Sequence, residues 1–120
     1  MYRDLYSYEK KWLNKLLEVN FKGKQVILRQ VMNAKVVRKE GYDFISLKFS
    51  VDKVEKYSYL VRVPVEMRVF QKDGAPILFL LHIINGYVDE LEIFTADFSK
   101  LDISYIEISK VEYIINERVK

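Results

Sequence analysis

The chain has 120 residues, of which 50% are hydrophobic, 31% are charged and 14% are aromatic. This length and composition are typical of one globular domain with its own core, so we expect a single domain over residues 1–120. Cysteine is absent, which excludes a disulfide framework, a thiolate zinc site and a cysteine nucleophile. Since no segment resembles a signal peptide or a membrane span, we expect a cytoplasmic protein with no membrane partner.

The net charge of +3 hides an uneven distribution. Basic residues dominate the first 39 residues, whereas residues 89–102 carry five carboxylates against Lys100 alone. Such a dipolar chain differs from a uniformly basic nucleic-acid binder. We therefore do not expect nucleic acid as a partner.

Apolar residues at three- and four-residue spacing predict two helices near the amino end. The first covers residues 5–18, begins with Asp4 or Ser7 as N-cap, and places Glu9 on its polar side. Trp12 lies on the apolar stripe and is expected to anchor the core. After a break around Gly23, a second and shorter helix is expected over residues 24–32.

Beyond the helices the apolar period changes to two, which predicts strands. Two are expected over residues 34–39 and 44–51, and a long one over residues 59–70 with Pro64 at an edge or bulge. The tail over residues 101–119 is expected to add one or two strands, with a helix over residues 109–119 as the alternative. The fold class is therefore α+β, with two N-terminal helices packed on a mostly antiparallel sheet of about five to seven strands.

The clearest element is a hairpin in which Asn85-Gly86 joins strands over residues 76–84 and 87–94. This residue pair favours a two-residue type I′ turn. Uninterrupted pairing from that turn would set Ile84 against Tyr87 and His82 against Asp89, with Glu90 and Glu92 on the opposite side. The hairpin is apolar on both sides, so we expect the helices on one face and more chain or a partner on the other.

His82, the only histidine, could act as a general base oriented by Asp89. The pair has no credible nucleophile and no second histidine for a metal, so we expect a structural pair and no catalytic or metal site. Glycine-rich phosphate motifs are missing, and no cofactor is expected.

Glu90 and Glu92 lie on one strand face, with Glu66 and Asp97 expected nearby. Carboxylates within an apolar face need either cationic neighbours or a partner. Arg62 and Arg68 are the candidate neighbours. The alternative is a partner-binding surface made of Glu66, Glu90, Glu92 and Asp97.

Three segments resemble a family of small bacterial domains of unknown function: Phe21-Lys22-Gly23-Lys24 with Gln30, then Arg62-Val63-Pro64-Val65-Glu66, then the hairpin from Leu80 to Asp97. The hairpin has the family's L-L-H-x-x-x-G-x-x-x-E-L-E-I pattern. The resemblance covers roughly residues 5–100, and the tail after Asp102 departs from it. Small domains of this kind are often encoded beside polymorphic toxins as immunity proteins, and the resemblance implies that role here.

We therefore expect a non-enzymatic binding protein, an immunity protein that occludes the active site of a cognate toxin. An acidic strand face would complement the basic cleft of a toxin nuclease. Two alternatives stay open: a small-molecule-binding or self-associating domain that uses the apolar hairpin as a homodimer face, and a hydrolase based on His82 and Asp89.

Overall fold

The computed structural model describes residues 1–53, 55–102, 106 and 108–116. Within them it has two helices and seven strands, which confirms the α+β class. In chain order the elements are β1 (Arg3–Asp4), α1 (Ser7–Leu16), α2 (Lys24–Val31), β2 (Lys35–Glu40), β3 (Phe44–Ser50), β4 (Val65–Val69), β5 (Ile77–Ile84), β6 (Tyr87–Thr95) and β7 (Val111–Ile115). No helix among the described residues is long and apolar enough to cross a membrane.

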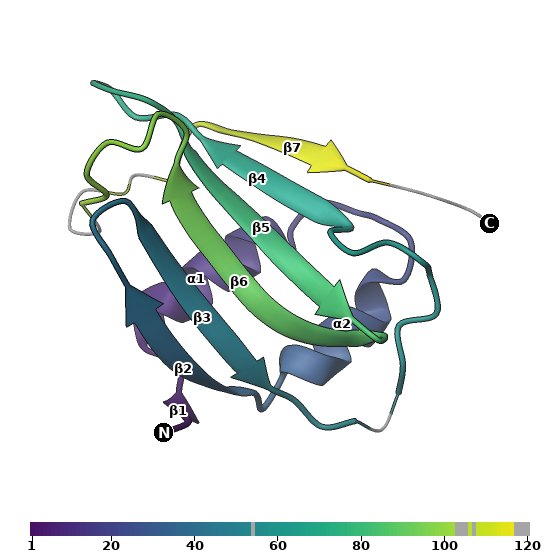
Figure 1. Ribbon diagram of the computed structural model, residues 1–120. Coiled ribbons are helices and arrows are strands. Elements are labelled where there is room, and N and C mark those ends of the chain that lie inside the picture. Colours follow the sequence, from purple (N-terminus) through teal and green to yellow (C-terminus); the bar gives the residue numbers. More distant parts are fainter. Residues whose placement is uncertain (54, 103–105, 107, 117–120) are drawn as a thin grey trace.

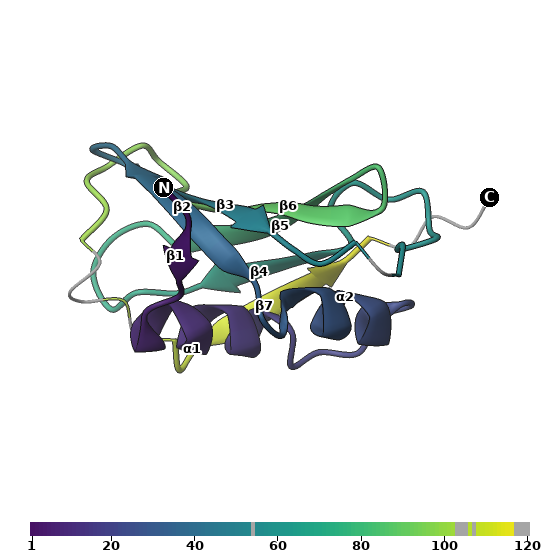
Figure 2. The ribbon, with the colours of Figure 1, turned by 90° about the horizontal axis from the view of Figure 1, so that it is seen from below.

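All seven strands form one antiparallel sheet in the order β1-β2-β3-β6-β5-β4-β7 (Figure 1). Both helices lie on the same side of this sheet (Figure 2). No described helix or strand covers the other side, which we call the open face. The helices therefore cover one apolar side of the hairpin, and the other side faces outward.

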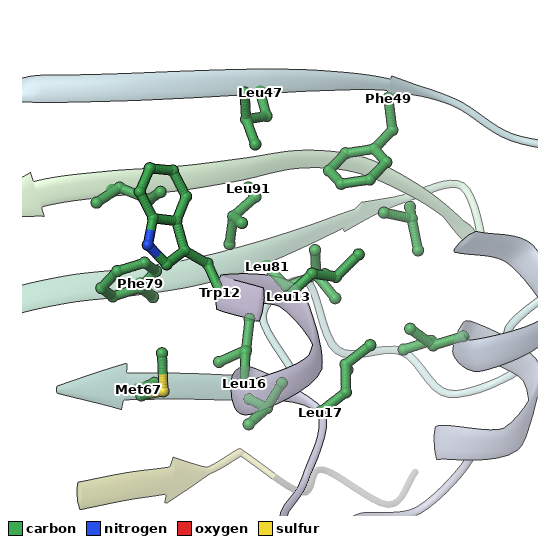
Figure 3. Close-up of a cluster of buried hydrophobic side chains, with 14 of the residues drawn as sticks. Trp12, Leu13, Leu16, Leu17, Leu47, Phe49, Met67, Phe79, Leu81 and Leu91 are labelled. Atoms are coloured by element: carbon green, nitrogen blue, oxygen red, sulfur yellow. The ribbon is translucent and has the colours of Figure 1, made fainter. Parts of the chain in front are cut away.

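The core lies between the helices and the covered side of the sheet (Figure 3). Trp12 is 4% exposed and meets the Phe79 ring edge-on, with 6.1 Å between ring centroids. Leu16 from α1 and Leu81 and Leu91 from the hairpin are fully buried. The prediction that Trp12 anchors the core is confirmed.

The amino end of α1 departs from the prediction, because its N-cap is Tyr6 rather than Asp4 or Ser7. Glu9 was expected on the polar side, but it is fully buried. Its carboxylate accepts a hydrogen bond from the Tyr6 backbone amide at 2.8 Å, so it satisfies one of the unpaired donors at the start of the helix. Glu9 thus caps the amino end of α1 from a buried position.

Two arginines hold the buried Glu9 carboxylate. Arg3 from β1 donates to both of its oxygens, at 2.8 and 2.9 Å, and Arg38 from β2 donates at 2.9 Å. Arg38 also donates to the exposed Glu40 carboxylate at 2.7 Å and to the Tyr8 hydroxyl at 2.6 Å. One buried anion therefore ties α1 to the first two strands.

The hairpin turns at Asn85-Gly86 as predicted, with both residues at positive φ (53° and 85°). The register beyond the turn differs from the prediction, because a bulge between His82 and Ile83 leaves Asp89 without an opposite residue. His82 therefore faces Glu90, and the predicted His82–Asp89 pair does not form. The bulge also lets Val88 and Leu91 both face the core, which strict alternation forbids.

The remaining strands differ from prediction mainly in their bounds. The expected strand over residues 59–70 begins only after Pro64, which has no N–H to donate to a ladder. Residues 111–115 form a strand, so the helical alternative fails for that part of the tail. The prediction of one or two strands over residues 101–119 cannot be followed in full, because residues 103–105, 107 and 117–120 lie outside the described residues.

Candidate protein-binding face

Four apolar side chains are neighbours on the open face of the three central strands. Phe44 pairs with Phe94 across β3 and β6, and Phe94 pairs with Leu78 across β6 and β5. Leu80 follows two residues after Leu78 on the same strand face. Phe44 is 38% exposed and the other three are half-buried. We call Phe44, Leu78, Leu80 and Phe94 the apolar patch.

Carboxylates and one arginine border this patch, since Arg68 on β4 is the cross-strand partner of Leu78. Leu80 lies between Glu92 on β6 and Glu66 on β4, which are its direct cross-strand partners. Glu90 lies on the same face as Glu92, two residues away, and faces His82. Three of the four carboxylates predicted to bind a partner therefore share one surface. Asp97 does not, because it lies in the turn after β6 and accepts a hydrogen bond from the Ser99 amide at 3.1 Å.

The partners of these carboxylates are mostly uncharged side chains. Glu66 accepts from the Asn116 amide at 3.0 Å, and Glu90 accepts from the Ser46 hydroxyl at 2.5 Å. The nearest cation to Glu90 is Lys48 at 3.9 Å, and Lys48 is closer to Asp89, at 3.0 Å. Neutral donors orient a carboxylate without cancelling its charge, but Lys48 opposite Glu90 and Arg68 opposite Leu78 carry positive charges on the same face, so the border is mixed in charge.

Neither of the two arginines considered as neighbours binds these carboxylates. Arg68 approaches Glu112 on β7 at 3.6 Å. Arg62 donates to the His82 ring at 3.3 Å. The structure therefore does not show the expected pairing of these carboxylates with Arg62 or Arg68, and their role in binding a partner stays a prediction.

His82 is held on both sides of its ring. Its Nδ1 accepts from Arg62, which assigns the ring proton to Nε2, and Nε2 lies 2.8 Å from Glu92 Oε1. Both ring nitrogens are thus engaged, and Asp89 instead accepts from Lys48. The hydrogen bond to Asp89 raises the pKa of Lys48, which favours its charged form. This geometry positions a side chain in a network and does not support His82 as a general base oriented by Asp89.

The described residues contain no cluster of three or more histidine, cysteine, aspartate or glutamate side chains that could hold a metal ion. The open face has an apolar centre, a border of carboxylates and cations, and polar side chains that hydrogen bonds already orient.

Sequence reasoning gave no role to Gln30, which clamps the tip of the hairpin. Gln30 is 3% exposed, and its amide nitrogen donates to the backbone oxygens of Glu55 and Gly86 at 2.9 and 3.0 Å. Its side-chain oxygen accepts from the Val88 amide, at the bulge, at 2.8 Å. The available signals were an amide next to apolar residues in a short helix and the place of Gln30 in the family resemblance. Gln30 fixes the bulge and so helps to set which side chains reach the open face.

Comparison with known proteins gives a family and no function. No curated protein and no solved structure matches the chain. A family model described as "Domain of unknown function (DUF6984)" matches residues 2–106, which include both helices and the first six strands. The chain belongs to this family of domains of unknown function.

Proposed function

We propose that this chain is a non-enzymatic binding protein that docks a protein partner against the open face of its sheet. The observation that supports this most strongly is the apolar patch formed by Phe44, Leu78, Leu80 and Phe94 on a sheet face that no described element covers. Contiguous apolar patches on protein surfaces often mark interaction sites. Buried apolar side chains at the centre of a contact supply most of its affinity.

The three carboxylates on this border suggest the charge of the partner. Glu66 and Glu92 flank the patch, and Glu90 extends the acidic surface along β6. Complementary charge raises association rates and excludes like-charged competitors. We infer a partner with a basic surface around an apolar contact, such as a toxin nuclease whose cleft binds phosphate. In this proposal the chain is an immunity protein that covers the cleft.

The test is co-expression with the protein encoded by the adjacent gene, with cell survival and co-purification as readouts. We expect the neighbour to be toxic alone, harmless with this chain, and recovered with it as a complex. A neighbour that is neither toxic nor bound would overturn the immunity role.

A matched pair of variants tests the face. Leu80→Arg introduces a charge into the apolar patch and should abolish protection. Met32→Arg makes the same type of change at a 71% exposed residue that follows α2, and should leave protection intact. Circular dichroism of both variants checks that each one folds. Equal protection by both variants would place the contact elsewhere.

A further inference from the structure

The strand β7 lies at one edge of the sheet. The pattern of its hydrogen bonds to β4 determines which backbone N–H and C=O groups point away from the sheet. The Phe70 amide donates to the Lys110 oxygen at 2.9 Å, and the Asn116 amide donates to the Pro64 oxygen at 3.0 Å. Because backbone groups alternate along an antiparallel strand, the even-numbered residues between these two bonds also face β4. The N–H and C=O groups of Val111, Tyr113 and Ile115 therefore point to the outer edge.

The described residues of this edge, Val111–Ile115, include none of the features with which natural sheets block further pairing, such as proline, a bulge or a row of charges. The pairing of β4 with β7 runs through all five residues of β7 without interruption. At the other end of the sheet, β1 covers the start of β2, and the charged run Arg38-Lys39-Glu40 follows. The contrast makes β7 the edge that is open to strand addition.

We propose that β7 pairs with β7 of a second copy of this chain, in antiparallel orientation, to give a homodimer with one continuous sheet. This inference goes beyond the proposed function and uses a different surface. The supporting observation is that the edge is self-complementary about Tyr113. When Tyr113 lies on the twofold axis, Val111 faces Ile115 of the partner subunit, and every outward N–H and C=O of the three residues finds a partner.

Side chains in this register also match. Val111, Tyr113 and Ile115 face the helix side of the sheet and are half-buried at its edge, so an added strand would extend the apolar layer beneath them. Tyr113 is already fixed by its hydroxyl, which donates to the Lys15 oxygen at 2.7 Å. The twofold axis runs perpendicular to the sheet. Both open faces therefore lie on one side of the dimer, where they could engage two partner molecules.

Light scattering over a range of concentrations tests the assembly. The wild-type chain should show twice its 14.4 kDa mass at micromolar concentration. Ile115→Pro removes one outward N–H and leaves the bonds to β4, so this variant should be monomeric, and the conservative Ile115→Val should remain dimeric. A wild-type chain that stays monomeric at hundreds of micromolar would overturn the proposal.

The register can be tested without relying on the proline variant, because the chain has no cysteine of its own. In the proposed dimer Glu112 faces Ile114 of the partner subunit in a pair without mutual hydrogen bonds, whose Cα separation of about 4.5 Å suits a disulfide. Glu112→Cys and Ile114→Cys proteins would be mixed in equal amounts and oxidised. The mixed disulfide should clearly exceed the half expected from random pairing. A random distribution would overturn this register and the dimer built on it.

Discussion

Replacing Glu9 by glutamine would remove the negative charge that two arginines share inside the protein. The Glu9 side chain is fully buried, and Arg38, one of its two partners, is only 11% exposed. Loss of one member of a buried ion pair leaves the remaining charge without a partner and lowers the free energy of unfolding by about 3–5 kcal/mol. Glutamine keeps one acceptor oxygen, so we expect the low end, about 3 kcal/mol. For a chain of this length that loss corresponds to a fall in Tm of about 12 °C.

The pH dependence of this loss follows from the ionisation of Glu9. Burial opposes the charged form, but hydrogen bonds from Arg3, the Tyr6 amide and Arg38 outweigh it and hold the pKa of Glu9 below its ordinary value of 4.5. A lowered pKa in the folded state stabilises the protein above the unfolded pKa, and this stability is lost as pH falls through the folded value. The difference in free energy of unfolding between wild type and Glu9→Gln should be largest at pH 7. It should shrink well below pH 4.5.

Urea denaturation of both proteins at pH 7 and pH 3 measures this difference. Glu40→Gln is the matched control, because Glu40 pairs with the same Arg38 but its side chain is 57% exposed. That control should cost less than about 1 kcal/mol at pH 7. A Glu9→Gln loss below 1 kcal/mol, or one that is the same at both pH values, would refute the electrostatic account of this site.

Two further substitutions test how the hairpin and α2 are held. Gln30→Leu leaves the buried Val88 amide without its acceptor and should lower the free energy of unfolding, measured by urea denaturation, by about 2–3 kcal/mol. The control Gln25→Leu, on the exposed side of α2, should lower it little. Equal losses in the two variants would contradict the role of Gln30 in holding the hairpin. Gly23→Ala should destabilise the chain by at least about 1 kcal/mol more than Gly74→Ala in thermal unfolding. Both glycines have positive φ, but of the two only Gly23 lies where the added Cβ would meet a ring, that of Tyr57. Similar losses at the two glycines would mean that this ring gives way easily.

The elements that periodicity and turn chemistry determine could be predicted from the sequence. Asn85-Gly86 identified the hairpin because few residues accept two successive positive φ values, and the apolar stripe through Trp12 identified α1 and its buried side. Alternation likewise placed Glu90 and Glu92 on one face, because they lie on the same side of the bulge.

What could not be predicted depends on contacts between distant segments. The bulge at Asp89 is held by Gln30, which lies 58 residues before Val88 in the chain, and the bulge alone changed the partner of His82. The burial of Glu9 depends on Arg38 from another element. Local pattern therefore identified strands and faces, while tertiary hydrogen bonds decided register and which charges are buried.

The open face is tested most directly by the affinity of the purified partner for two arginine variants, measured by isothermal titration. A hot-spot side chain contributes at least about 2 kcal/mol, and we propose Leu80 as one, so Leu80→Arg should weaken binding at least about 30-fold relative to wild type. Met32→Arg, on the helix side of the molecule, should bind within about twofold of wild type. Retained affinity in Leu80→Arg would contradict docking on the open face, whatever the affinity of Met32→Arg.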